Sequence, residues 1–444
     1  MDNRPKDTHL LDRNLRHDIF ATTLWRSLSI HPTHGTMSLW KFFRSNARWL
    51  SAGALISLST GFGQTFFISI YAPYFREDFG LSHGEWGGLY MIATICSAIV
   101  LTQTGRLSDH IRARTLAVVV ILGFAAVCIG LSMVQSVVML GVLVFGLRFC
   151  GQGMLSHISV VSMGKWFRAG RARALAISHL GFSAAEAIFP AGALLLIPII
   201  GWRSSWLVAA ALLVFVAGPL IYWLLQQERS PKAAAESQGG PGLFGRHWTR
   251  PEMLRHWLFW AMLPGLAAPS WVGTTVFFQI APLTDEKGWD ILDYAATAYP
   301  AYSVVAIFAS FAFGVLADRK GVVNVLPLYL LGWACATILL GYSDSLWMGA
   351  LALGVAGTGT AAVSIIVGAI FAELYGTKHL GGIKALFAAA SVLSSALGPG
   401  LSGVLLDAGV DFSTQCIGMG VALFAISGVF VILRARILAL RAGV

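Results

Sequence analysis

The stretch Gly105-Arg-Leu-Ser-Asp109-His-Ile-Arg112-Ala-Arg114 is a short polar loop between two segments that are too apolar to be stable in water. A related stretch, Gly314-Val-Leu-Ala-Asp318-Arg319-Lys320-Gly321, recurs in the second half of the chain, again between two apolar segments. Because internal repeats of helices are common in membrane proteins, a polar loop that recurs in this setting indicates a duplicated membrane protein.

Composition excludes a soluble protein. Of the 444 residues, 56% are hydrophobic and 12% are charged, and the mean hydropathy is +0.71. A helix that crosses the bilayer needs roughly 20 apolar residues, and about twelve such segments fit between Trp49 and Leu433. The sequence therefore predicts an all-α integral membrane protein with about twelve transmembrane helices in two pseudo-symmetric bundles of six.

Basic residues explain the net charge of +10 without a nucleic-acid partner. If the N-terminus is cytoplasmic, only Arg76, Arg203 and Lys287 fall on the outer side, and Arg148 lies within a helix. This is the positive-inside distribution of a polytopic protein. It predicts a bacterial inner-membrane protein with both termini in the cytoplasm.

The chain divides into five expected segments. A basic N-terminal tail over residues 1–48, with a second candidate start at Met37, precedes a six-helix bundle over residues 49–226. A polar cytoplasmic linker over 227–255 leads to a second bundle over 256–434 and a C-terminal tail over 435–444. The five cysteines lie in apolar segments without paired spacing, so we expect no disulfide framework, no metal and no cofactor. The sequence contains neither a His-Glu-x-x-His motif nor a nucleophile elbow, so no motif indicates an enzyme.

The two polar loops resemble those that join helices two and three, and helices eight and nine, in the major facilitator superfamily of secondary transporters. The second copy fits the family pattern through Gly314, Asp318, Arg319 and Gly321, whereas the first has His110 at the basic position and Arg112 in place of the second glycine. The resemblance implies two six-helix bundles that rock about a central solute site.

Shorter patches resemble the monocarboxylate and oxalate transporter branch of that superfamily. They are Trp166-Phe167 with Arg171, Gly201-Trp202-Arg203, Ala372-Glu373-Leu374-Tyr375-Gly376, Gly381-Gly382-Ile383, Gly398-Pro399 and Asp407. The branch resemblance implies that the solute is an organic anion.

By the family resemblance, the loop residues form a latch that breaks as the bundles rock. A carboxylate at a helix end can meet a neighbouring helix N-terminus and arginines. The expected latch residues are Gly105, Asp109, Arg112, Gly314, Asp318, Arg319, Gly321 and Glu373, the last paired with Lys378 or Lys384. The alternative is that these residues only anchor the topology.

Two ionised side chains, Arg148 and Glu186, lie near the middle of predicted helices, and both fall near the mid-membrane. A direct pair between them is expected. Either Glu186 binds and releases a proton while Arg148 tunes its acidity, or the two form a permanent salt bridge. The segment from Arg148 to Gly153 resembles a superfamily motif associated with proton coupling.

The charge of the solute can be inferred from the basic residues that one predicted helix lacks. The interior of helix eight, between Tyr294 and Leu316, contains no Lys or Arg, so the base that a small carboxylate would need is missing there. Aromatic and amide groups near the midplane favour a neutral, planar, hydrogen-bonding solute such as riboflavin. The candidate solute-binding residues are Gln64, Phe67, Tyr71, Tyr90, Trp271, Phe278, Gln279, Tyr299 and Tyr302. Many of these rings could instead face lipid or pack between helices.

The sequence thus predicts proton-coupled uptake of a small organic solute by a monomer, with protons, the solute and membrane lipid as its partners. A monocarboxylate or dicarboxylate transporter and a drug or metabolite exporter remain as alternatives. Against export, helix five has Gly181 and Pro190 without the glycine-proline signature of the proton antiporters.

Overall fold

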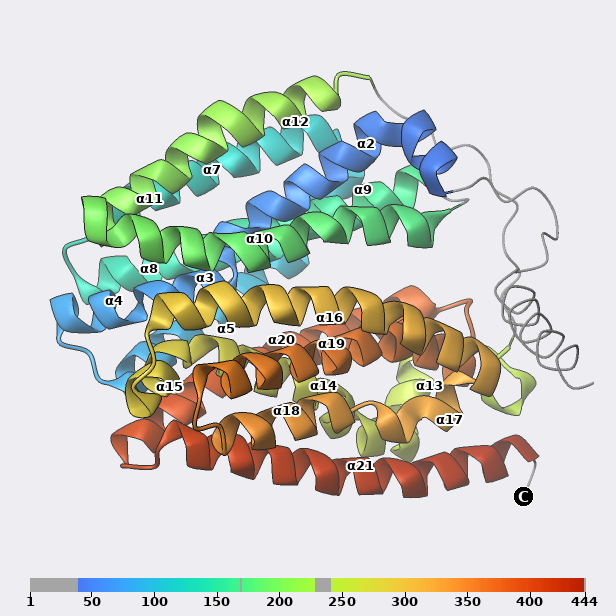
Figure 1. The fold of residues 1–444 in the computed structure, drawn as a ribbon. Coiled ribbons are helices and arrows are strands. Elements are labelled where there is room, and N and C mark those ends of the chain that lie inside the picture. The colour runs from blue at the N-terminus through green and yellow to red at the C-terminus, as the bar shows by residue number, and fades with distance from the viewer. Residues whose placement is uncertain (1–38, 168–169, 228–240, 443–444) are drawn as a thin grey trace, which may run out of the picture. The chain divides into compact units, whose positions relative to one another are not determined.

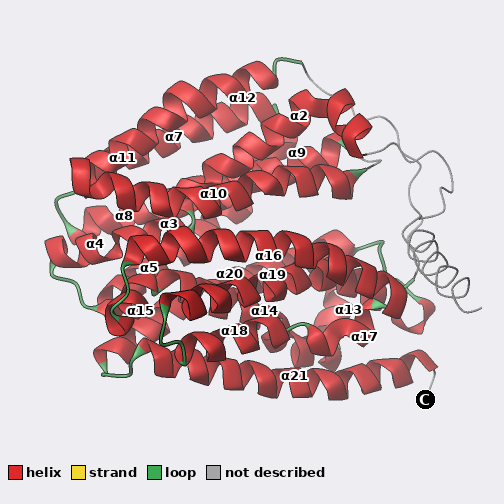
Figure 2. Ribbon diagram, viewed as in Figure 1, coloured by secondary structure: helices red, strands yellow, loops and turns green. Residues whose placement is uncertain are grey.

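The computed structural model describes residues 39–167, 170–227 and 241–442, and the described residues form helices and no strands (Figure 2). The chain divides into two compact units, Met1–Ala47 and Arg48–Val444. The second unit contains the long apolar segments. They form helices because a helix satisfies every backbone polar group within the segment, as a bilayer requires.

The helices of the first half run from α2 to α12, coloured blue to green in Figure 1. Its elements are α2 (Leu39–Ser59), η1 (Thr60–Gly63), α3 (Thr65–Ile68), η2 (Ser69–Tyr71), α4 (Ala72–Phe79), α5 (His83–Thr104), α6 (Leu107–His110), α7 (Ala113–Ser132), α8 (Val137–Leu147), η3 (Arg148–Leu155), α9 (Ser156–Trp166), α10 (Arg171–Ile200), α11 (Trp202–Ala211), η4 (Leu212–Ala217) and α12 (Gly218–Leu224). The first helix begins at Leu39 rather than near Trp49, so it is longer than the sequence predicted.

The second half repeats the arrangement. Its elements are η5 (Leu243–Gly245), α13 (Arg250–Arg255), α14 (Trp257–Phe278), α15 (Ile280–Lys287), α16 (Ile291–Lys320), α17 (Val322–Val325), η6 (Leu326–Leu328), α18 (Leu331–Gly341), α19 (Leu346–Tyr375), α20 (Leu380–Asp407) and α21 (Phe412–Ala442). The last helix continues past Arg434, so most of the expected C-terminal tail is helical. Part of the expected linker is also structured, in η5 and α13.

Eleven of the described helices are long and apolar enough to cross a membrane. A twelfth span is formed by a broken pair, Phe42–Gly63 with Thr65–Phe79, which bends by 43°. The break lies at Gln64, whose backbone is extended (φ −88°, ψ 156°). In sequence, the glycines before it, Gly61 and Gly63, permit close packing or a break in the helix. Both occur, since a Cβ atom on Gly63 would clash with the carbonyl oxygen of Leu147.

Helix seven departs from regular helix at a related place. The segment α14 ends at Phe278, Gln279 leaves the helical conformation (φ −95°, ψ 28°), and α15 continues from Ile280. Helix one is therefore broken at a glutamine, whereas helix seven only deviates at one, because the N–H of Gln279 still donates to Thr275 and its carbonyl accepts from Leu283, both over 3.0 Å. Interrupted spans are common at the solute sites of secondary transporters, because unwound backbone can line a site within the membrane.

The two halves meet along two pairs of helices. The helix α5 of the first half packs along α20 of the second, and α10 packs along α16, as Figure 1 shows for α10 and α16. Helix one also reaches helix seven, through contacts between α3 and α14. These contacts place Gln64 and Gln279 near the boundary between the two halves. The charged residues Arg148 and Glu186 lie near the same boundary.

Candidate solute and proton site

Arg148 holds the break in helix one. The helices approach closely here, since a Cβ atom on Gly151 would lie 2.7 Å from the Cα atom of Gly63. The Nη1 of Arg148 donates to the carbonyl oxygen of Gly63 over 3.1 Å, and its Nε donates to the Thr94 hydroxyl over 3.2 Å. Because the chain is extended after Gly63, this carbonyl is near the end of regular helix, and the guanidinium satisfies it.

The guanidinium of Arg148 is fully buried and its charge has no acidic partner among the described residues. Its centre lies 5.0 Å from the ring centroid of Tyr90, a cation–π distance, and Nη1 also reaches the Thr65 hydroxyl at 3.4 Å. The Nη2 atom is buried without a hydrogen-bond partner. Arg148 also begins η3, a π-helical segment, and such segments occur frequently at functional sites.

Glu186 contacts the opposite half of the protein. It lies on α10, is 5% exposed, and its Oε2 accepts a hydrogen bond from the Ser303 hydroxyl of α16 over 3.3 Å. Tyr299 and Tyr302, also on α16, lie close enough to interact electrostatically with this carboxyl group. Ser303 was not among the expected site residues, because only its contact with Glu186 distinguishes it from other helix serines.

The expected pair between Arg148 and Glu186 does not form. Arg148 is directed at helices one and two, whereas Glu186 is directed at α16, and no ion pair joins them in the described structure. Both side chains are buried in the protein. Their partners depend on the rotation of each helix about its axis, which the sequence does not give.

Two of the expected solute-binding rings pack within the first half. Phe67 and Tyr71 both contact the indole of Trp206 on α11, with ring centroids 5.4 Å and 4.4 Å away. The Tyr71 hydroxyl bonds to the Ser205 hydroxyl at 2.9 Å. Gln64 is buried beside them at the helix break. Phe67 and Tyr71 therefore pack between helices, which was the alternative to a role in solute binding.

Tyr90 and Phe278 connect the halves. Their ring centroids lie 4.7 Å apart, and Trp86 stacks on Phe278 at 5.9 Å. The Tyr90 hydroxyl bonds to the Thr65 hydroxyl at 2.7 Å, beside Arg148. An aromatic cluster therefore runs from the buried guanidinium to helix seven.

The remaining aromatic residues belong to the second half. Phe277 contacts the rings of Tyr299 and Tyr302, at 5.4 Å and 5.1 Å, and the Tyr302 hydroxyl bonds to the Thr360 hydroxyl at 2.9 Å. The Nε2 atom of Gln279 on helix seven is buried without a hydrogen-bond partner in the described part of the chain. The hydroxyl of Tyr299 on helix eight is also buried and lies near the side chain of Ser69. Trp271 is half-buried, and a Cβ on Gly398 of α20 would lie 3.0 Å from its Cδ1.

The first polar loop is held by helix four. The carbonyl of Gly105 bonds to Nε2 of His157 at 3.0 Å, and the Nζ of Lys165 donates to the carbonyl of Ser108 over 2.9 Å. Asp109 lies in the short helix α6, and Arg112 immediately precedes α7. These contacts stay within the first half of the protein.

The second polar loop begins within a helix. Gly314 lies inside α16, in line with the predicted helix eight, and Gly321 ends that helix with a φ of 80°, which favours glycine. Asp318 and Arg319 are exposed on the last turn, and neither forms an ion pair among the described residues.

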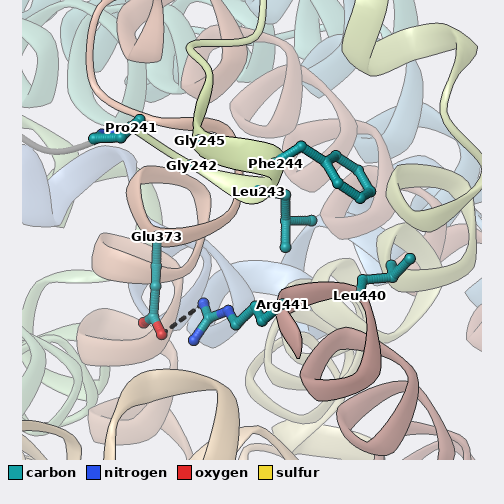
Figure 3. A pocket seen from close by; sticks show the side chains of 8 residues that line it. All are labelled: Pro241, Gly242, Leu243, Phe244, Gly245, Glu373, Leu440 and Arg441. Atoms are coloured by element: carbon teal, nitrogen blue, oxygen red, sulfur yellow. Dashed lines mark ion pairs between the residues drawn. The ribbon is translucent and has the colours of Figure 1, made fainter. Parts of the chain in front are cut away.

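Glu373 pairs with Arg441 of α21 rather than with Lys378 or Lys384. The carboxylate and guanidinium are 2.8 Å apart, and their side chains point toward one another at the edge of a pocket of about 560 Å³ (Figure 3). The other wall of the pocket is the segment 241–245. The expected second latch is therefore a contact within the second half.

The segment from Gly242 to Thr249 is fastened to this same face. The backbone N–H of Trp248 donates to the carbonyl of Tyr375 over 2.9 Å, and the rings of these two residues are 5.7 Å apart. At its end, Thr249 and Glu252 cap α13 reciprocally. The backbone N–H and the hydroxyl of Thr249 donate to Glu252 and hold the pKa of that carboxyl group below its ordinary value.

The membrane-spanning helices form two halves that meet over buried polar groups and an interrupted span. This arrangement defines a membrane transport protein. The chain matches the family model of the Major Facilitator Superfamily over residues 53–301 and 293–441. The protein belongs to that superfamily, and it is a transporter and not an enzyme. This match does not show that the protein belongs to the monocarboxylate and oxalate branch.

Solved structures share the fold. A bacterial homologue of the human lysosomal transporter Spinster, in an inward-facing and unoccupied conformation, is 17% identical, with a TM-score of 0.61 over 92% of this chain and 96% of that chain. The nucleoside transporter NupG is 13% identical, with a TM-score of 0.60 over 88% and 99%. The human organic anion transporter MFSD10 is 16% identical, with a TM-score of 0.57 over 86% and 99%. No curated protein sequence matches the chain.

Proposed function

We propose that this protein takes up a small organic solute across a bacterial inner membrane by alternating access, driven by protons that bind Glu186. The observation that carries the proposal is the hydrogen bond from Ser303 to Glu186. It joins α10 of one half to α16 of the other, at a buried position within the membrane. When the halves move apart, this carboxyl group must change partners, which links its protonation to the conformational cycle.

The conformation supports alternating access. Contacts between α5 and α20 close the end of the protein that holds Asp407, whereas Asp318 and Arg319 at the opposite end form no ion pair among the described residues. The distribution of Lys and Arg favours a cytoplasmic linker end, with both termini on that side. The state described would then be closed to the outside. We expect the monomer, surrounded by lipid, to be the working unit.

For the solute, our first candidate is a neutral planar ring compound of the riboflavin kind. The rings of Phe277, Phe278 and Tyr90 can stack on such a solute. The unpartnered Nε2 of Gln279 and the buried hydroxyl of Tyr299 can form hydrogen bonds with it. These groups come from helices two, seven and eight, on both sides of the contact between the halves.

A second candidate, a small organic anion, is favoured by Arg148. Its charge has no acidic partner among the described residues, and its Nη2 atom has no acceptor. A carboxylate could supply both, since guanidinium and carboxylate groups match in charge and geometry. This site would replace the basic residue that helix eight lacks.

The deciding experiment is thermal unfolding of the purified protein with flavins, small carboxylates and cationic drugs, because a ligand that binds the folded state raises its melting temperature. The same panel is applied to Arg148→Gln. Stabilisation by flavins in both proteins supports the neutral solute. Stabilisation by carboxylates that is lost in Arg148→Gln supports the anion. Stabilisation by cationic drugs alone would contradict both candidates and favour an exporter.

A further inference from the structure

The N-terminus of α5 is capped by both halves of the protein. The first four backbone N–H groups of a helix have no partner within the helix. The hydroxyl of Ser82 accepts from the N–H of Glu85 over 3.1 Å, and the carboxylate of Glu85 accepts from the N–H of Ser82 over 2.8 Å. This capping box leaves the N–H groups of His83 and Gly84 unsatisfied within the first half.

The missing acceptor is Asp407, the last residue of α20 in the other half. Its carboxylate accepts hydrogen bonds from the N–H groups of His83 and Gly84 over 3.0 and 2.7 Å, and from the hydroxyl of Ser82 over 2.6 Å. The negative charge also lies at the positive end of the α5 dipole. A carboxylate from one half therefore completes the N-terminal cap of a helix in the other.

Glycines allow this contact. A Cβ atom on Gly84 would lie 2.7 Å from Oδ2 of Asp407, one on Gly87 would clash with the carbonyl of Pro399, and one on Gly403 would clash with the carbonyl of His83. The backbones of α5 and α20 thus touch directly at this end. The two helices cannot separate here without breaking the bonds to Asp407.

We propose that Asp407 is a latch that closes the outer end of the transporter by capping α5 from the opposite half. This device differs from the two polar loops, which lie at the other end of the helices. It goes beyond the proposed function, because it requires neither a particular solute nor proton coupling. When the outer end opens, the N–H groups of His83 and Gly84 must turn to water instead.

The chain offers a matched control in Asp411. Its Oδ1 accepts from the N–H of Thr414 over 2.6 Å, so it caps α21 within its own half. It lies on the same end of the protein, and replacing it by asparagine changes the charge equally. It has no bond to α5.

The test measures the separation of the outer ends in the full-length protein, reconstituted in lipid nanodiscs without solute. Spin labels are placed at Glu77 in the first half and Asp344 in the second, both exposed at this end, after the five native cysteines are replaced. Pulsed dipolar spectroscopy then gives the distance distribution. Melting temperatures show that each variant is folded.

We expect Asp407→Asn to increase the population with a long separation by roughly fivefold to tenfold, since bonds to a charged acceptor are stronger than those to a neutral one. Ser82→Ala, which removes one of the three bonds, should shift the distribution in the same direction by less. Asp411→Asn should leave it unchanged. Equal distributions for Asp407→Asn and the unsubstituted protein would overturn the proposal, as would an equal shift in Asp411→Asn.

A cross-link keeps the proposal testable if Asp407→Asn does not fold. In the double variant Ser82→Cys and Asp407→Cys, oxidation to the disulfide should leave only the short separation in the distribution. Chemical reduction of the disulfide should restore the long separation. A long separation that persists after complete oxidation would show that opening does not separate α5 from α20 at this point, which the latch requires.

Discussion

The guanidinium of Arg148 donates a hydrogen bond of 3.1 Å to the carbonyl oxygen of Gly63, the residue before the break in helix one. A buried cation thus stabilises an interrupted span on a neighbouring helix. The first expectation comes from this contact. Arg148→Lys keeps the charge but loses the planar set of donors, so it should destabilise the protein by about 1 to 3 kcal/mol.

Equilibrium unfolding of Arg148→Lys in mixed micelles measures this change. The control is Arg319→Lys, since Arg319 is exposed on the last turn of α16 and should tolerate lysine without loss. If Arg148→Lys proved as stable as the control, the break in helix one would not depend on the guanidinium.

Glu186→Gln should abolish accumulation of solute driven by a proton gradient but preserve exchange between equal pools of solute. The amide still meets Ser303, whereas it cannot take up a proton. Transport into proteoliposomes, with and without a pH gradient, measures both activities. Glu77→Gln, at an exposed position of α4, is the matched control. Accumulation that survives Glu186→Gln would make Glu186 a structural residue.

Two glycines of α10 should respond oppositely to alanine. A Cβ on Gly181 would overlap the carbonyl oxygen of Ala54 in helix one, whereas nothing lies within 4 Å of a Cβ on Gly192. Gly181→Ala should therefore cost about 1 to 3 kcal/mol through overpacking. Gly192→Ala should be neutral or slightly stabilising. Unfolding curves of the two variants compare them directly, and equal curves would contradict the close packing of α10 on helix one.

The ion pair between Glu373 and Arg441 should contribute little. Both side chains are about one third exposed, at 28% and 33%, and pairs of this kind are worth about 0 to 1 kcal/mol. A double-mutant cycle with Glu373→Gln and Arg441→Gln isolates the coupling energy, which should shrink further as salt is added. A coupling well above this range would assign the pair a larger role at the pocket of Figure 3.

Hydropathy predicted the number of spans, because each span must satisfy the same length and polarity requirements. The break in helix one was also anticipated from Gly61 and Gly63. Contacts were harder to predict. Arg148 and Glu186 are both buried, but the prediction that they pair with each other was wrong, because a sequence gives no helix rotation.

Asp407 illustrates a second limit. It attracted notice only through a family resemblance, since its partners Ser82, His83 and Gly84 are distant in sequence and two of them contribute backbone groups. The capping box of Ser82 and Glu85 lies entirely within the first half. No pattern in the sequence showed that the cap was incomplete without a carboxylate from the other half.

The contact of Glu186 with Ser303 across the two halves has an electrical consequence. A proton bound at Glu186 changes the net charge of the moving site by one unit. Under the proposed mechanism, a neutral solute carried with one proton would move one elementary charge inward in each cycle. The membrane potential would then add about 2.3 kcal/mol of driving force per 100 mV, even when the pH is equal on both sides.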